Sequence, residues 1–258
     1  MTKRKKIVVG ILILLLLIVV GSLLAFNKSA SAPEKPAEQT KQKTEEPPKP
    51  QPKPPPVPAK PETPNKQTST VIEDPMNILV VVNKIRSLPS TFVPSDLVAT
   101  RGGTMRSVAA GALNQMLSDA ANAGVPMTVI SGYRSYNTQA SLYNSYVSKD
   151  GVAAADRYSA RPGYSEHQTG LVADLGNSNG GCALEICFAN TAGGQWLIAN
   201  ASRYGFIIRY PEGKESLTGY QYEPWHVRYV GVEVASQIVK SNQILEQYLG
   251  LPTSATYR

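Results

Sequence analysis

The sequence has very few of the side chains that bind transition metals through nitrogen or sulfur, with only two histidines and two cysteines among 258 residues. Cys182 and Cys187 form a single C-x4-C pair, and a structural zinc site would need a second pair. Zinc thiolates are therefore the weaker alternative, and the two cysteines can instead close a small disulfide loop in an oxidising compartment. The two histidines, His167 and His226, are the side chains to follow for chemistry.

A basic surface for nucleic acid is also lacking in most of the chain. The formal net charge is +7, but residues 1–75 hold 12 of the 26 basic and 7 of the 19 acidic side chains. The remaining residues are nearly neutral, with 14 basic and 12 acidic side chains. No footprint for a phosphate backbone is evident there, so we expect no nucleic-acid partner.

Charged residues are absent from one long apolar run near the N-terminus. Residues 1–6 include four basic side chains, and residues 7–26 form an uncharged apolar run of 20 residues. This length matches the hydrocarbon core of a bilayer, and the charge asymmetry predicts a cytoplasmic segment at 1–6 and a single-pass transmembrane anchor at 7–26. Everything after Phe26 is then extracellular. The alternative is a signal peptide cleaved near Ala32, which would release a secreted protein.

Large apolar side chains are scarce in the next segment. Residues 27–75 are rich in proline, lysine, glutamate, glutamine and threonine, with 12 prolines between Pro33 and Pro64. Such a composition cannot bury enough surface to offset the entropy of ordering, so it predicts a disordered, extended linker. A docking ligand for another protein is the alternative interpretation.

Residues 76–258 have the length and pattern of one folded domain. Apolar positions at Val108, Ala112, Leu113, Met116 and Ala120 recur at helical spacing and stop at Gly124. Helices early and late around a few strands predict an α+β domain with a small antiparallel sheet. The predicted elements are helices near 108–120, 138–147, 194–204 and 231–249, and strands near 125–130, 170–175, 206–210 and 220–230.

Both histidines lie beside carboxylates in motifs that suit a catalytic metal. His167 and Asp174 stand seven residues apart, on either side of a predicted turn into a strand, and His226 closes the segment Glu223-Pro224-Trp225-His226. Two imidazoles and one carboxylate supply three ligands for zinc and leave a fourth position for water. Glu223 is then a free carboxylate that can take a proton from that water.

Arg134 follows a predicted buried strand in Ser131-Gly132-Tyr133-Arg134. A rigidly held guanidinium there can face the negative charge that develops on a carbonyl oxygen during hydrolysis. On spacing alone, structural histidines, a surface ion pair for Arg134 and a chance E-x-x-H segment remain alternatives.

At these motifs the sequence resembles the LAS zinc peptidases, and within them the VanY-type D-alanyl-D-alanine carboxypeptidases of peptidase family M15B. The resemblance rests on the S-G-Y-R-S segment with Gln139, the S-x-H-x-x-G-x-x-x-D segment and the E-P-W-H segment, in the family's order. Weaker similarity extends over residues 78–232. One departure is Val172, which stands where the family usually has alanine.

The resemblance implies a hedgehog/DD-peptidase-like fold with one zinc ion per domain. It implies that His167, Asp174 and His226 bind the metal, that Glu223 is the catalytic base and that Arg134 stabilises the transition state. Contacts to the terminal residue of the substrate are implied for three further residues, Gln139, Ser165 and Tyr220. The loop between Cys182 and Cys187 is not part of the family motif.

The implied reaction is removal of the C-terminal D-alanine from peptidoglycan stem peptides at the outer face of a cell membrane. Alternatives are an L,D-carboxypeptidase that acts on tetrapeptides and an endopeptidase that cuts cross-links. A zinc-containing wall-binding module is the non-enzymatic alternative, but such a module would need neither Glu223 nor Arg134.

Overall fold

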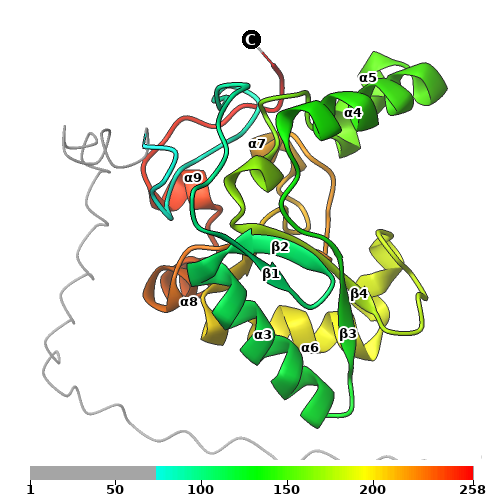
Figure 1. The fold of residues 1–258 in the computed structure, drawn as a ribbon, viewed down its shortest axis with the longest axis vertical. Helices are drawn as coiled ribbons and strands as arrows, with labels where there is room; N and C mark the ends of the chain where they lie inside the picture. Colours follow the sequence, from blue (N-terminus) through cyan, green and yellow to red (C-terminus); the bar gives the residue numbers. More distant parts are fainter. Residues whose placement is uncertain (1–73, 258) are drawn as a thin grey trace, which may run out of the picture. The chain divides into compact units, whose positions relative to one another are not determined.

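A four-stranded antiparallel sheet forms the framework of the part of the chain that the computed structural model describes, residues 74–257 (Figure 1). The strand order is β3-β4-β6-β5, so β4 and β6 are the two inner strands. The bounds are β3 Met127–Ser131, β4 Val172–Asn177, β5 Phe206–Ile208 and β6 His226–Tyr229.

A separate two-stranded hairpin precedes the first long helix. It pairs β1 Leu97–Thr100 with β2 Gly103–Arg106. Gly102 lies in its turn with a φ of +96°, a conformation that a side chain would strain. Neither strand was predicted, because these short segments show no clear alternation of apolar and polar residues.

The helices surround the four-stranded sheet (Figure 1). Helices α3 and α6 lie near β3 and β4, whereas the hairpin of α4 and α5 lies at the opposite end of the view. The α-helices are α3 Ser107–Asn122, α4 Tyr136–Asp150, α5 Val152–Tyr158, α6 Ala192–Asn200, α7 Glu215–Thr218, α8 Val232–Ser241 and α9 Leu245–Tyr248. The 3-10 helices are η1 Glu166–Thr169, η2 Ile186–Asn190 and η3 Ala201–Tyr204.

The main hydrophobic core lies between α3, the sheet and α6. Helix α3 buries Ala109, Leu113, Met116 and Ala120 on its inner face. Val108, which the sequence analysis placed on this face, is 42% exposed instead. Val172, the departure from the family pattern, is completely buried and causes no opening in the sheet.

The predicted α+β class with a small antiparallel sheet is confirmed, but several predicted bounds are wrong. The last predicted helix divides into α8 and α9, because Asn242 adopts a left-handed conformation with a φ of 51°. The strand predicted at 220–230 is reduced to β6, since the segment that contains Pro224 forms a turn rather than a strand. Helix α5 was not predicted at all.

No helix within residues 74–257 is both long and apolar enough to cross a bilayer. The predicted basic segment at 1–6, the anchor at 7–26 and nearly all of the linker at 27–75 lie outside the described residues.

Candidate active site

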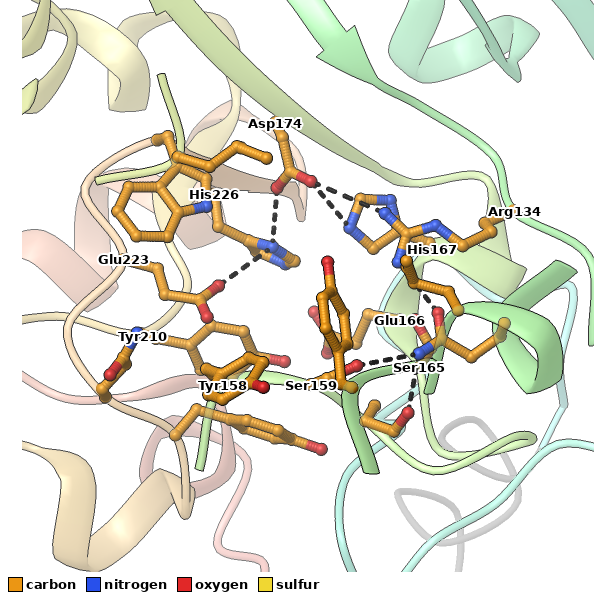
Figure 2. Close-up of a pocket in the computed structure, with 18 residues that line it drawn as sticks. Arg134, Tyr158, Ser159, Ser165, Glu166, His167, Asp174, Tyr210, Glu223 and His226 are labelled. Atoms are coloured by element: carbon orange, nitrogen blue, oxygen red, sulfur yellow. Dashed lines mark hydrogen bonds and ion pairs between the residues drawn. The ribbon is translucent and has the colours of Figure 1, made fainter. Parts of the chain in front are cut away.

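The sheet register brings three predicted metal ligands together. Asp174 on β4 lies opposite His226 on β6, and His167 lies in η1 just before β4. The potential ligand atoms of these residues all lie within 4.8 Å of one another. Figure 2 shows Asp174 between the two imidazoles, at 3.2 Å from His167 Nε2 and 3.0 Å from His226 Nδ1. The antiparallel pairing therefore assembles residues that are up to 59 positions apart in the chain.

The cluster suits a divalent cation such as zinc. All three side chains are at most 7% exposed. Asp174 Oδ1 is buried and makes no hydrogen bond to any described residue, although His226 Nδ1 is close to it. A buried carboxylate oxygen without a hydrogen bond costs free energy unless a cation or water satisfies it. Two imidazoles and a carboxylate form a ligand set typical of catalytic zinc.

Hydrogen bonding fixes which nitrogen of His167 is available to a metal. Its Nδ1 lies 2.7 Å from the carbonyl oxygen of Gly132, so Nδ1–H donates and Nε2 keeps a lone pair facing Asp174. Burial, followed by the nearby charge of Arg134, lowers the pKa of His167 and favours this neutral form.

Gly132 must be a glycine for this geometry. A Cβ atom at this position would lie 2.6 Å from the carbonyl oxygen of Thr104 on β2. The close approach holds the end of β3 against β2, where an irregularity in register between Val129 and Ser131 also bends the strand. The S-G-Y-R segment thereby places the Gly132 carbonyl under His167 and turns Arg134 towards the metal cluster.

Glu223 stands beside the cluster without belonging to it. Its Oε2 lies 3.5 Å from His226 Nδ1, and the side chain is 8% exposed. Backbone hydrogen bonds from Glu223 N to Tyr210 O and from His226 N to Glu223 O hold the turn that carries it. Burial and the charge of Asp174 raise the pKa of Glu223 well above its usual value. A carboxylate with a raised pKa is a stronger base than an ordinary one and suits proton transfer.

Arg134 lies on the opposite side of the cluster from Glu223 (Figure 2). Its Nη1 donates to Gln139 Oε1 at 2.8 Å, and its Nη2 donates to Ser131 Oγ at 2.8 Å. The same Nη2 lies 3.8 Å from Asp174 Oδ2. These contacts hold the guanidinium in one orientation at the edge of the cavity, as a preorganised charge requires.

The three residues predicted to contact substrate all line a single pocket of about 190 Å³ together with the metal cluster. Gln139 already uses its amide, because Oε1 accepts from Arg134 and Nε2 donates to the carbonyl oxygen of Ala160 at 2.6 Å. Gln139 therefore connects Arg134 to the pocket wall in addition to facing the cavity. Ser165 and Tyr220, at 4% and 3% exposure, are also buried in the lining of this pocket.

Tyr257, which no sequence motif indicated, contacts the pocket residue Tyr220. Its hydroxyl oxygen accepts a hydrogen bond from Arg161 N at 3.0 Å and lies 3.2 Å from the Tyr220 hydroxyl. The Arg161 guanidinium also stacks over the Tyr257 ring at 4.2 Å. No local motif marks this residue near the end of the chain, so sequence patterns offer no signal for it.

A buried charge network behind the pocket was also missed. Glu166 Oε1 accepts hydrogen bonds from Arg209 and Arg228, and Arg209 also binds both carboxylate oxygens of Glu246. All four side chains are at most 1% exposed. Glu166 lines the pocket and precedes His167, so this network supports the metal cluster from behind.

Cys182 and Cys187 are joined in a disulfide with a Cα–Cα distance of 5.6 Å. Neither sulfur is therefore a free thiolate for a metal.

Comparison with known proteins places this geometry in a family. The family model described as VanY, D-alanyl-D-alanine carboxypeptidase, matches residues 102–232. The putative carboxypeptidase YodJ of Bacillus subtilis (strain 168) is 43% identical over 187 residues, which cover 69% of this chain and 68% of YodJ.

Solved structures are also similar in fold and sequence, and two of them illustrate the range. The LdcB LD-carboxypeptidase has a TM-score of 0.65 and 41% identity, covering 70% of this chain and 89% of its own. A mutant of the vancomycin-resistance D,D-pentapeptidase VanY in complex with Zn(II) has a TM-score of 0.58 and 34% identity, covering 66% of this chain and 98% of its own. The chain belongs to the VanY family of zinc peptidases, within peptidase family M15B.

Proposed function

We propose that this protein is a zinc-dependent carboxypeptidase that hydrolyses the C-terminal D-alanine from peptidoglycan stem peptides ending in D-Ala-D-Ala. The observation that carries this proposal is the placement of one free, buried carboxylate, Glu223, beside three converging ligands, His167, Asp174 and His226. A purely structural metal site needs no such carboxylate. Each domain holds one such cluster among its described residues, so we propose one zinc ion per domain.

A zinc ion held by these three residues would polarise the scissile carbonyl and lower the pKa of bound water to about 7. Glu223 takes the proton from the attacking water and later delivers it to the departing amino group. The raised pKa of Glu223 suits both steps, because the group must accept and then release one proton near neutral pH. Arg134 faces the negative charge that develops on the carbonyl oxygen, and Gln139 holds Arg134 in place.

The pocket lining supports removal of a terminal residue over internal cleavage. Buried polar side chains, among them Gln139, Ser165 and Tyr220, line the pocket together with the metal cluster. These groups suit a terminal residue and its carboxylate, which an endopeptidase would not meet at the cleaved bond.

The test uses the zinc-loaded full-length protein with a pentapeptide that ends in D-Ala-D-Ala and, separately, the tetrapeptide one residue shorter. Released D-alanine is followed by mass spectrometry. Glu223→Gln should abolish release while zinc content stays unchanged, whereas Glu212→Gln, an exposed glutamate on the preceding loop, should behave as the wild type. Zinc-loaded wild type without release from either peptide would contradict the proposal and favour a wall-binding module or an endopeptidase.

An L,D-carboxypeptidase is the second candidate. It is favoured by the higher identity to the LD-carboxypeptidase structure, 41% against 34% for the D,D-pentapeptidase. D-alanine released mainly from the tetrapeptide would establish this specificity, and release from the pentapeptide alone would establish the D,D specificity.

We further propose that the catalytic domain, residues 76–258, lies outside the cell membrane, tethered by the anchor at 7–26 and the linker at 27–75. The apolar run and its basic flank support this arrangement. Protease treatment of intact cells should then remove the catalytic domain from the membrane fraction. A product in the medium that begins after Ala32 would instead establish cleavage and secretion.

A further inference from the structure

The disulfide loop, residues Cys182–Cys187, follows the strand that carries Asp174. It is fixed at both ends: Cys182 packs against the main core, and Phe188, directly after Cys187, is completely buried. Within the loop, Glu185 N donates to Cys182 O, and Phe188 N donates to Glu185 O at 3.0 Å. The disulfide bond thus closes a loop whose ends are already anchored next to the sheet.

Leu184 at the middle of this loop has an uncommon conformation. Its φ is +57°, in the left-handed region that a branched side chain rarely adopts. The side chain is 43% exposed and lines the catalytic pocket. An apolar side chain held in a strained backbone conformation at the rim of a catalytic site points to a functional role.

Three further partly exposed residues of the pocket lining are also apolar or aromatic. They are Leu142 and Tyr146 on α4 and Tyr158 on α5. The rings of Tyr146 and Tyr158 meet edge to face at 5.1 Å, and the Tyr158 hydroxyl donates to Asp150 at 2.6 Å. These contacts fix the aromatic pair. The partly exposed rim of the pocket therefore includes several apolar or aromatic side chains, whereas the metal cluster and Glu223 belong to the buried part of its lining.

A carboxypeptidase places the departing residue in the inner part of its pocket, so the chain before the cleaved bond must leave across this rim. We propose that the disulfide loop is a specificity-determining element: Leu184 contacts the aliphatic part of the stem-peptide residue that precedes D-Ala-D-Ala, and the disulfide holds Leu184 in position. This inference rests on the proposed function and deepens it by assigning the upstream substrate contact.

The experiment compares two substrates with the zinc-loaded full-length protein. Diacetyl-L-Lys-D-Ala-D-Ala contains the upstream residue, and acetyl-D-Ala-D-Ala lacks it. Leu184→Ala should lower kcat/KM for the longer substrate about 5- to 20-fold, mainly through KM, because about one buried leucine side chain of contact is lost. The value for the shorter substrate should change less than about twofold.

Three further variants separate contact from folding. Leu184→Gly should give the same loss with the fold intact, since glycine accepts the positive φ. Ile186→Ala is the matched control, because Ile186 lies in the same loop, is 52% exposed and does not line the pocket. The double variant Cys182→Ser/Cys187→Ser should reproduce the selective loss with unchanged zinc content.

The outcomes distinguish the two proposals. The proposed contact is overturned if the wild type releases D-alanine but both Leu184 variants keep the wild-type kcat/KM. It is also overturned if the Leu184 variants lose kcat/KM equally on the longer and the shorter substrate. Unchanged kinetics of the double cysteine variant overturns the role of the disulfide. Absence of release by the wild type overturns the proposed function, and the inference with it.

Discussion

Replacing Glu246 by glutamine should strongly destabilise the domain, although Glu246 is not one of the metal ligands. Glu246 accepts hydrogen bonds from Arg209 Nη1 at 2.9 Å, Arg209 Nη2 at 2.6 Å and Asn83 Nδ2 at 3.0 Å. Arg209 also binds Glu166, and Glu166 is the carboxylate partner of Arg228 as well. The network therefore balances two buried cations with two buried carboxylates, and the substitution leaves one cation without compensation.

The expected cost follows from burial. Removing one partner of a buried ion pair costs about 3–5 kcal/mol, because the remaining charge stays desolvated. Glutamine keeps one acceptor oxygen for Arg209. The loss in the free energy of unfolding should therefore lie near the lower end of this range, at about 3 kcal/mol. For a domain of this size, a loss of 1 kcal/mol in the free energy of unfolding lowers Tm by roughly 2–4 °C. The loss in Tm should thus be about 6–12 °C.

The same substitution has a predicted pH dependence. Burial alone raises the pKa of Glu246, but the charge of Arg209 and hydrogen bonds from Arg209 and Asn83 outweigh it and lower the pKa below its ordinary value of 4.5. A lowered folded-state pKa means that the stabilising contribution is complete above the unfolded-state pKa and is lost as the pH falls through the folded-state pKa. The difference between wild type and variant should therefore be full at neutral pH and shrink below about pH 4.5.

Urea unfolding of zinc-free wild type and Glu246→Gln, at several pH values from about 7 to 3.5, measures both effects. Glu233→Gln, an exposed glutamate on α8, is the control and should change the free energy of unfolding by less than about 0.5 kcal/mol. A loss below about 1 kcal/mol at pH 7, or a difference that does not shrink on acidification, would refute the reasoning.

Three further substitutions test the site itself. Asp174→Asn should lower zinc occupancy in equilibrium dialysis, because the carboxylate between the imidazoles is removed; full zinc occupancy would contradict its role as a ligand. Arg134→Lys should lower kcat about 10²- to 10³-fold with unchanged zinc content, since a lysine cannot reproduce both guanidinium hydrogen bonds, and wild-type kcat would exclude Arg134 as the oxyanion partner. Tyr257→Phe should raise KM severalfold at nearly constant kcat, because the hydroxyl that contacts both Arg161 N and the Tyr220 hydroxyl is lost. An unchanged KM would show that these hydrogen bonds do not shape the pocket.

Much of the site was predictable because its chemistry is local in the sequence. His226 and Glu223 lie three residues apart in one turn, and His167 and Asp174 lie seven apart across η1 and the start of β4. With only two histidines available, few combinations of ligands existed. The helix near 108–120 and the strands around β3, β4 and β5 were predicted for the same reason, since their periodicity is a local property.

The tertiary structure alone decided how these segments combine. The register of β4 against β6 places Asp174 opposite His226, and the hydrogen bond from His167 Nδ1 to the Gly132 carbonyl selects the tautomer of that histidine. Partners far apart in sequence, such as Glu246 with Arg209 and Tyr257 with Tyr220, leave no local pattern. The sequence by itself thus determined which side chains can perform the chemistry. Their distances, burial and protonation depend on long-range packing, because a charge or a hydrogen bond acquires its energy only from the groups that surround it in space.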